Sequence, residues 1–176
     1  MEGTRSERFQ EALAYATKMH EGQKRKEGIP YITHPVAVAE MLRDWGCDED
    51  YQICGLFHDL LEDTTADPAD ILRSGGAEVL TAVRLLTKEP GYVLQDYVRN
   101  LKENPMSRTV KAADRLHNLR SAPVASIGFR RHYIEETLEN FMDLSPEMSG
   151  AVSRLAATLP EGEKKEELLQ RIREKN

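Results

Sequence analysis

The chain lacks the features that mark secreted, membrane-spanning or metal-thiolate proteins. Its two cysteines, Cys47 and Cys54, do not form a CxxC pair, so we expect neither a disulfide nor a thiolate ligand. No apolar run approaches the roughly 20 residues of a membrane span, and residues 1–10 are too polar for a secretory signal. The sequence therefore predicts a cytoplasmic protein with no membrane partner.

Aromatic residues are also scarce, and basic residues are outnumbered by acidic ones. The formal net charge of −6 argues against nucleic acid as a partner bound through a broad basic surface. Aromatic residues make up only 6% of the 176 residues and β-branched runs are rare, whereas charged residues reach 31%, which favours helices. The 40% hydrophobic content supports one domain with a substantial core. We expect a single all-α multi-helix bundle over 1–176, with a core over about 6–158 and a charged helix over about 161–174. The oligomeric state stays open.

Start and stop signals divide the chain into helices. Thr4 with Glu7 predicts a capping box for a first helix over about 6–20. His20 near its end is expected to be a cation or a donor to the last carbonyls. Asp48 caps a helix that runs to about Glu62. The other helices are expected over about 35–45, 68–73, 77–87, 94–101, 105–121, one or two over 130–158, and 161–174.

The stretch 55–64 carries the densest chemistry. On a helical wheel of about 100° per residue its leucines and phenylalanine fill one side. The other side holds His58, Asp59, Glu62 and Asp63, whose carboxylates repel one another unless a cation or proton lies among them. Gly55 on the same side would leave clearance for that cation. A buried metal and an exposed acidic helix face are the two readings of this pattern.

Three other places offer partners. The loop 22–33 contains Lys24, Arg25 and Lys26, which form either a solvated loop or a phosphate-neutralising patch. His34 precedes Pro35 at a helix entry, where it is either a cap or a ligand. A polar stripe follows the helix near 105–121, at Lys111, Asp114, Asn118 and Ser121. Asp114 has apolar neighbours, so its carboxylate needs a partner there, either a salt bridge to Arg115 or Lys111 or a metal.

Two histidines and two aspartates suffice for a transition-metal site with positions open to water and substrate. The predicted ligands are His34, His58, Asp59 and Asp114. Glu62 and Asp63, one turn further on, would act as general-base groups that orient the attacking water. The predicted phosphate-neutralising side chains are Lys24, Arg25, Lys26 and Lys111.

These residues resemble a known signature. His34, then His58-Asp59, then Asp114 is similar to the H…HD…D pattern of the HD phosphohydrolase superfamily, an all-α metal-dependent family. The runs Gln23–Lys26, Pro30–Pro35, His58–Thr64 and Lys111–Asn118 further resemble the hydrolase domain of the RelA/SpoT alarmone enzymes. The resemblance covers about residues 9–140.

The resemblance implies removal of the 3′-pyrophosphate from guanosine tetra- or pentaphosphate, (p)ppGpp, a small nucleotide substrate. It implies one divalent metal, usually manganese, although the ligand set also suits iron or zinc. His34, His58, Asp59 and Asp114 match its metal ligands, and Glu62 with Asp63 matches its water-activating pair. Arg25, Lys26, Asn118 and Ser121 match positions that contact the nucleotide, with Arg25 stacking on guanine.

The length of the chain leaves no room for the synthetase domain of the long enzymes, so a stand-alone hydrolase is expected. The segment 87–101 matches no phosphate-binding loop of the family, which leaves recognition of the 5′-phosphates open. Two alternatives are an HD-type phosphohydrolase of other specificity, such as a 5′-nucleotidase or an NADPH 2′-phosphatase, and a non-catalytic alarmone-binding module.

Overall fold

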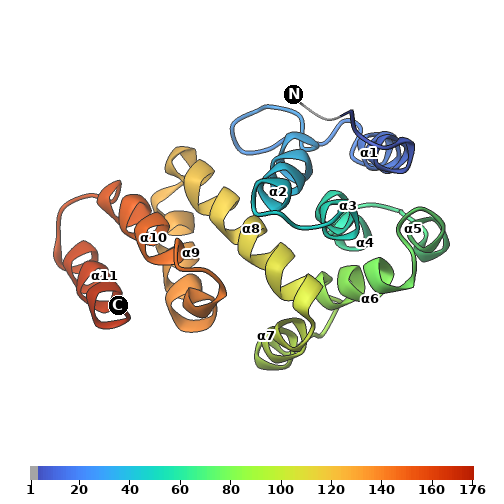
Figure 1. Cartoon of the computed structure of the whole chain (residues 1–176). Helices are drawn as coiled ribbons and strands as arrows, with labels where there is room; N and C mark the ends of the chain where they lie inside the picture. The colour runs from blue at the N-terminus through green and yellow to red at the C-terminus, as the bar shows by residue number, and fades with distance from the viewer. Residues whose placement is uncertain (1–3) are drawn as a thin grey trace. The chain divides into compact units, whose positions relative to one another are not determined.

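The computed structural model describes residues 4–176, and regular structure in this range is helical (Figure 1). The elements are α1 (Glu7–Met19), α2 (Thr33–Asp44), α3 (Glu49–Phe57), α4 (Leu60–Asp63), α5 (Pro68–Gly75), α6 (Ala77–Leu86), α7 (Leu94–Glu103), α8 (Pro105–Ser121), the 3-10 turn η1 (Ala122–Val124), α9 (Ile127–Asn140), the 3-10 turn η2 (Met142–Leu144), α10 (Met148–Ala157) and α11 (Glu163–Glu174). Within the described residues, β pairing is limited to an isolated bridge between Lys24 and Pro30. The predicted all-α class is confirmed.

Packing divides the chain into two compact units, one up to Ala113 and one over Asp114–Asn176. The boundary falls inside α8, a helix that runs unbroken across it. Residues 1–3 of the predicted domain lie outside the described residues. None of the helices between residues 4 and 176 is long and apolar enough to cross a membrane.

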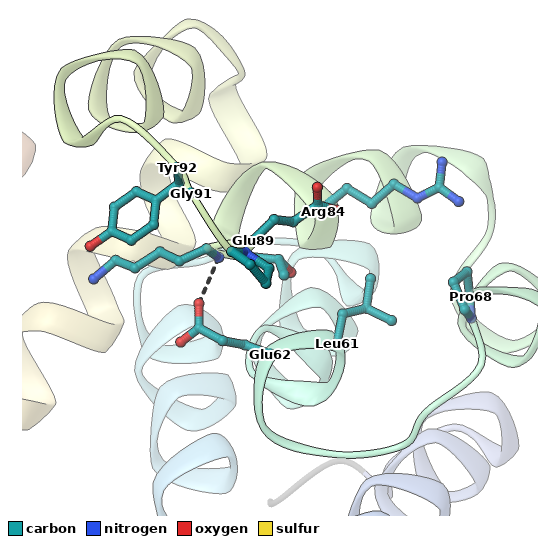
Figure 2. Close-up of a pocket in the computed structure, with 10 residues that line it drawn as sticks. Leu61, Glu62, Pro68, Arg84, Glu89, Gly91 and Tyr92 are labelled. Carbon is teal, nitrogen blue, oxygen red and sulfur yellow. Dashed lines mark hydrogen bonds between the residues drawn. The ribbon is translucent and has the colours of Figure 1, made fainter.

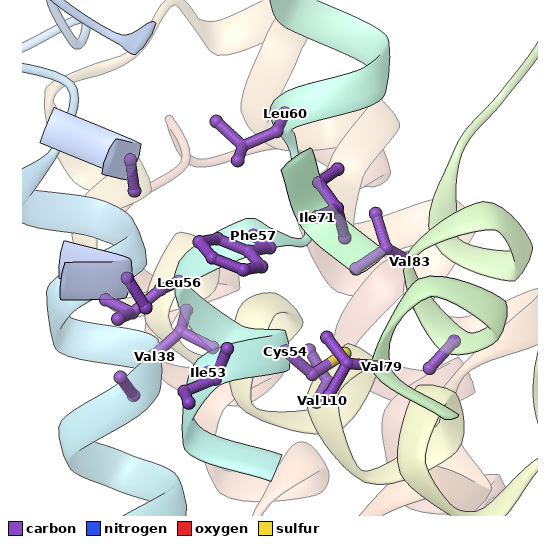
Figure 3. Packing of buried hydrophobic residues seen from close by; sticks show 14 of the residues in the cluster. Val38, Ile53, Cys54, Leu56, Phe57, Leu60, Ile71, Val79, Val83 and Val110 are labelled. Carbon is purple, nitrogen blue, oxygen red and sulfur yellow. The ribbon is translucent and has the colours of Figure 1, made fainter. Parts of the chain in front are cut away.

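The first unit is built around α3, which packs against α1, α2, α5 and α6. Every α3 residue from Gln52 to Phe57 is buried, so this helix is surrounded by protein rather than exposed along one face. Figure 3 shows Phe57 among buried side chains contributed by other elements, including Val38 of α2, Ile71 of α5 and Val83 of α6. Apolar contacts on all sides fix the position of such a helix. They also fix the starting point of the residues that directly follow it, His58 and Asp59.

The predicted single helix through His58 to Glu62 is wrong. Helix α3 ends at Phe57, Asp59 has φ of −101° and ψ of −4°, and α4 begins at Leu60. At the break, Nδ1 of His58 donates to the carbonyl oxygen of Gly55 at 2.6 Å. The imidazole thus hydrogen-bonds to a carbonyl in the last turn of α3. The helix is interrupted between this turn and α4, which carries Glu62 and Asp63.

Gly55 has a different role from the one predicted. A Cβ added there would lie 2.9 Å from Cδ1 of Leu42, 3.3 Å from the backbone nitrogen of Ala39 and 3.3 Å from Cγ1 of Val38. All three belong to α2, so the missing side chain allows α2 and α3 to approach closely. It does not provide clearance for a cation.

The first helix is also capped differently. Ser6, not Thr4, is the N-cap residue, and its hydroxyl accepts a hydrogen bond from the backbone N–H of Phe9 at 3.0 Å. Thr4 and Ser6 are both good capping residues, and the register in which Phe9, Ala12 and Ala16 are buried selects Ser6.

In the second unit, a buried arginine of α8, Arg115, contacts several side chains of α9 and the residue that follows it. The Arg115 guanidinium carbon lies 4.1 Å from the Tyr133 ring centroid and 4.3 Å from that of Phe141, and Nη2 donates to Oε1 of Glu136 at 2.9 Å. Burial disfavours its charge, but the charges of Tyr133, Glu136 and Asp114 and the Glu136 hydrogen bond outweigh this and raise its pKa. The cation is therefore retained in a stacked and paired cage.

Replacing Gly55 by Ala tests the close approach of α2 and α3. We expect Gly55→Ala to lower the free energy of unfolding by about 1–3 kcal/mol, because the α2 backbone must move to admit the methyl group. Gly128→Ala is the matched control, since a Cβ there meets nothing within 4 Å, and it should leave stability unchanged or slightly raised. Urea unfolding measures both, and a Gly55→Ala protein as stable as the Gly128→Ala protein would contradict the packing role.

The cage around Arg115 predicts a large cost for losing its charge. Arg115→Met should lower the free energy of unfolding by about 3–5 kcal/mol because Glu136 loses its hydrogen bond to the buried guanidinium. Arg120→Met, on the same helix, breaks an exposed ion pair with Glu147 and should cost less than about 1 kcal/mol. Equal midpoints for the two variants in urea would rule out the cage as a stabilising element.

Candidate metal centre

His34, His58 and Asp59 converge in the first unit. Each offers one ligand atom, and these atoms lie within 4.8 Å of one another. Oδ2 of Asp59 is 3.0 Å from Nε2 of His58 and 3.8 Å from Nε2 of His34. Both histidine side chains are buried, whereas that of Asp59 is 18% exposed. Three of the four predicted ligands thus form one cluster with a route to solvent.

The two imidazoles are oriented by the backbone around them. Because Nδ1 of His58 donates to the Gly55 carbonyl, its Nε2 is left with a lone pair directed toward Asp59. His34 lies in the first turn of α2, where its backbone N–H donates to the carbonyl of Tyr31 at 3.0 Å. Its ring meets the His58 ring edge to face, with centroids 5.1 Å apart. Each histidine therefore projects from a fixed helix end.

Asp59 is held by a residue to which the sequence assigned no role. The hydroxyl of Tyr31 donates to Oδ2 of Asp59 at 2.5 Å. The Tyr31 ring also contacts the His34 ring edge to face at 5.9 Å. Tyr31 stands three residues before His34, within the run that resembles the family. That position was the one sign in the sequence that Tyr31 could belong to the site.

A third histidine, His20, contacts Tyr31 and supports the loop between α1 and α2. The His20 ring centroid is 4.8 Å from that of Tyr31, and its Nδ1 donates to Oε1 of Gln23 at 2.8 Å. Gln23 in turn donates from Nε2 to the backbone carbonyl of Asp63 at 2.8 Å. Burial lowers the pKa of His20, so the predicted cation at the end of α1 is corrected to a buried imidazole that favours its neutral form. This chain of contacts ties the loop after α1 to α4.

The cluster fits a divalent transition metal. Nitrogen and carboxylate ligands bind such ions at about 2.0–2.2 Å, which places neighbouring donor atoms about 3.0–3.6 Å apart. The observed separations of 3.0 and 3.8 Å are close to this range. Two imidazole nitrogens and one carboxylate oxygen are also the donor types that iron, manganese and zinc accept. A metal here would have positions left for further ligands.

The predicted water-activating pair lies on α4, directly after the cluster. Oε1 of Glu62 accepts a hydrogen bond from the backbone N–H of Lys88 at 2.6 Å, which Figure 2 shows as a dashed line. Asp63 is the last residue of α4 and accepts from Gln23 through its carbonyl. The loop after α6 and the loop after α1 therefore contact two consecutive residues at the C-terminal end of this short helix.

The basic run Lys24–Lys26 forms part of a tight loop. The backbone N–H of Arg25 donates to the carbonyl of Ile29 at 2.9 Å, and Gly28 supplies the positive φ of 83° that the turn requires. Nε of Arg25 lies 3.4 Å from Oε2 of Glu27. Lys24 and Lys26 are exposed. Partial burial of the Lys26 ammonium lowers its pKa, opposed by the charge of Glu27 and reinforced by that of Arg25.

The predicted stripe on α8 is divided between the two units. Lys111 belongs to the first unit, where its Nζ lies 6.0 Å from the Tyr97 ring centroid. In the second unit, Nδ2 of Asn118 donates to Oδ1 of Asp114 at 2.9 Å, and the Ser121 hydroxyl donates to the carbonyl of His117 at 2.8 Å. The assignment of Asp114 as a fourth metal ligand stays a prediction.

The chain is similar to several known proteins. Residues 12–89 match the family described as HD domain. A protein of Synechocystis sp. named as a probable guanosine-3′,5′-bis(diphosphate) 3′-pyrophosphohydrolase is 36% identical over 145 residues, which cover 76% of this chain and 19% of that protein. A GTP pyrophosphokinase of Streptomyces coelicolor is 34% identical over 146 residues, covering 78% of this chain and 17% of that protein. The chain thus spans about a fifth of the length of the curated relatives it matches.

A solved structure extends the likeness over most of the chain. It is described as a metazoan ortholog of SpoT that hydrolyzes ppGpp, and it aligns with a TM-score of 0.69 and 26% identity over 88% of this chain and 96% of its own. The chain carries an HD domain. The domain is of the RelA/SpoT type, as the sequence motifs predicted.

Metal binding can be measured through stability. Protein stripped with a chelator and then given Mn²⁺ at about a hundred times its dissociation constant should gain about 3 kcal/mol, because only the folded site binds. His58→Ala should remove this gain in a thermal-shift titration. His132→Ala, which removes an exposed histidine, should keep it. The site is refuted if His58→Ala and the unaltered protein respond equally.

Proposed function

We propose that this chain is a metal-dependent (p)ppGpp 3′-pyrophosphohydrolase. The observation that carries the proposal is the buried cluster of His34, His58 and Asp59, followed within one turn by Glu62 and Asp63 on α4. The named activities of a Synechocystis relative and of the metazoan SpoT ortholog support the same reaction. The proposed partner is this small nucleotide alone, and the proposed location is the cytoplasm.

We further propose manganese as the native metal, with iron and zinc as the ions that the same donors would accept. His34, His58 and Asp59 would hold it, and Asp114 would add a carboxylate, an assignment that rests on the resemblance of the Lys111–Asn118 run to the family. When bound, a divalent cation lowers the pKa of water and offsets the charge that develops on a phosphoryl group.

Glu62 and Asp63 would orient the attacking water and accept its proton. The water oxygen forms a bond to the phosphorus attached to the ribose 3′-oxygen, and the bond from that phosphorus to the 3′-oxygen breaks. Guanosine tetraphosphate thus gives pyrophosphate and a guanosine 5′-diphosphate with a free 3′-hydroxyl. The anchor from Lys88 N–H to Glu62 supports this role, because it fixes the carboxylate before substrate arrives.

Substrate contacts are proposed on the resemblance and on accessibility. Arg25 would stack on guanine, and Lys24, Lys26 and Lys111 would neutralise phosphates. The exposure of the Lys24 and Lys26 residues supports this assignment. Asn118 and Ser121 would contact the nucleotide through an amide and a hydroxyl.

Product analysis with guanosine tetraphosphate and Mn²⁺ tests the proposal. Pyrophosphate and guanosine 5′-diphosphate should appear in equal amounts, and a chelator should stop the reaction. Inorganic phosphate as the sole released product would contradict it. Turnover of simple 5′-monophosphates or of NADPH in place of the tetraphosphate would indicate the alternative specificities, and tight binding without turnover would indicate a binding module.

The carboxylates of α4 make a separate prediction. Glu62→Gln and Asp63→Asn should each lower kcat by about 10²–10⁴-fold, because the amide cannot accept the proton of water. Glu103→Gln, at an exposed position that ends α7, should retain full kcat. Steady-state kinetics with far-UV circular dichroism separates lost chemistry from lost folding, and full activity in both α4 variants would remove them from the mechanism.

A further inference from the structure

A cavity of about 790 Å³ opens beside Glu62, lined by α4, the end of α6 and the loop that follows it. Its walls include Leu61, Glu62, Arg84, Lys88 and Tyr92. In Figure 2, Arg84 extends toward Pro68 at one end of the cavity, and the Tyr92 ring lies at the other end, with Glu62 between them. The volume lies in the range of small-molecule sites, about 300–1,000 Å³.

Two cations of this cavity are available to a ligand. Among residues 4–176, neither Arg84 nor Lys88 has a carboxylate oxygen within 4.0 Å. The Lys88 ammonium instead lies 5.7 Å from the Tyr92 ring centroid and 5.4 Å from that of Tyr97. Tyrosine faces attract a cation but leave its N–H donors free to bind an anion.

A third cation contacts the same aromatic ring as the second. Lys111 Nζ is 6.0 Å from the same Tyr97 ring that Lys88 contacts. Two ammonium groups that contact one ring raise the positive potential around it, which attracts an anion. Of the lining carboxylates, Glu62 accepts a hydrogen bond from the Lys88 N–H and Glu89 lies exposed. The arrangement favours a strongly charged ligand group such as a phosphate.

We propose that this cavity binds a phosphate group of the substrate, other than the one attacked, through the Lys88 side chain. The inference rests on the proposed function for the identity of the substrate, and it fills the gap left at residues 87–101, where the sequence offers no recognisable phosphate loop. Two sources share the chemistry: the 5′-diphosphate of the nucleotide, and the outer phosphate of the leaving pyrophosphate.

Lys88 serves two purposes through different atoms. Its backbone N–H holds Glu62, whereas its side chain reaches toward Tyr92 and Tyr97. A side-chain substitution therefore removes the ammonium group and keeps the anchor of the catalytic carboxylate. Loss of the phosphate contact should appear in KM, with kcat preserved.

Kinetics on two substrates tests the proposal. Lys88→Met should raise KM for guanosine tetraphosphate about tenfold or more, with kcat within about twofold. Lys88→Arg should restore KM, and Lys18→Met, an exposed lysine of α1, should change nothing. If guanosine 3′-diphosphate without 5′-phosphates keeps its KM, the cavity holds the 5′-diphosphate; an equal rise assigns the leaving pyrophosphate. An unchanged KM for both substrates, or a fall in kcat alone, overturns the proposal.

Equilibrium binding decides the question independently of turnover. Guanosine 5′-diphosphate and inorganic pyrophosphate are titrated by calorimetry into chelator-treated protein, so that no metal contributes. One of them should bind Lys88→Met about tenfold or more weaker than the unaltered chain and Lys18→Met. Equal affinities overturn the cavity proposal. If the binding difference is present but the unaltered chain does not hydrolyse the tetraphosphate, only the proposed function is overturned.

Discussion

The candidate metal centre depends on one hydrogen bond, from Nδ1 of His58 to the carbonyl of Gly55. It fixes which imidazole nitrogen faces Asp59, and it falls where α3 ends and the chain turns into α4. The acceptor residue has a second role, because the missing side chain of Gly55 lets α2, which carries His34, lie against α3. One residue thereby sets both the distance between two helices and the direction of a ligand. Burial of α3 on all sides makes this geometry costly to disturb.

Around that bond, support comes from loops rather than from additional helices. Tyr31 holds Asp59, His20 and Gln23 connect the same loop to Asp63, and the loop after α6 holds Glu62. One loop therefore contacts the Asp59 carboxylate and the main-chain carbonyl of Asp63, and a second loop contacts the Glu62 carboxylate. Such positioning is what hydrolysis requires, because a misplaced general base loses much of its effect on rate.

The sequence predicted the fold well because helix signals are local. Pro, Gly and capping residues placed most helix boundaries within a few residues, and the paired histidines and aspartate identified the cluster. The break at His58–Asp59 could not be predicted, since a side chain that bonds to a main-chain carbonyl leaves the apolar periodicity unchanged. Gly55 was misread because a wheel shows the angle of a residue and not what packs against it. Tyr31 and the Lys88 cavity depend on contacts over about 26–28 residues of separation, which spacing does not reveal.

The anchor of Glu62 has a consequence for how this chain can diverge. A main-chain N–H is present in every residue except proline, so the identity of residue 88 can drift while the donor persists. The loop that lines the cavity is thus free to acquire new side chains without releasing the carboxylate that we propose activates water. With the roles proposed above, a substitution at residue 88 would change selectivity while the main-chain support of the chemistry stays in place.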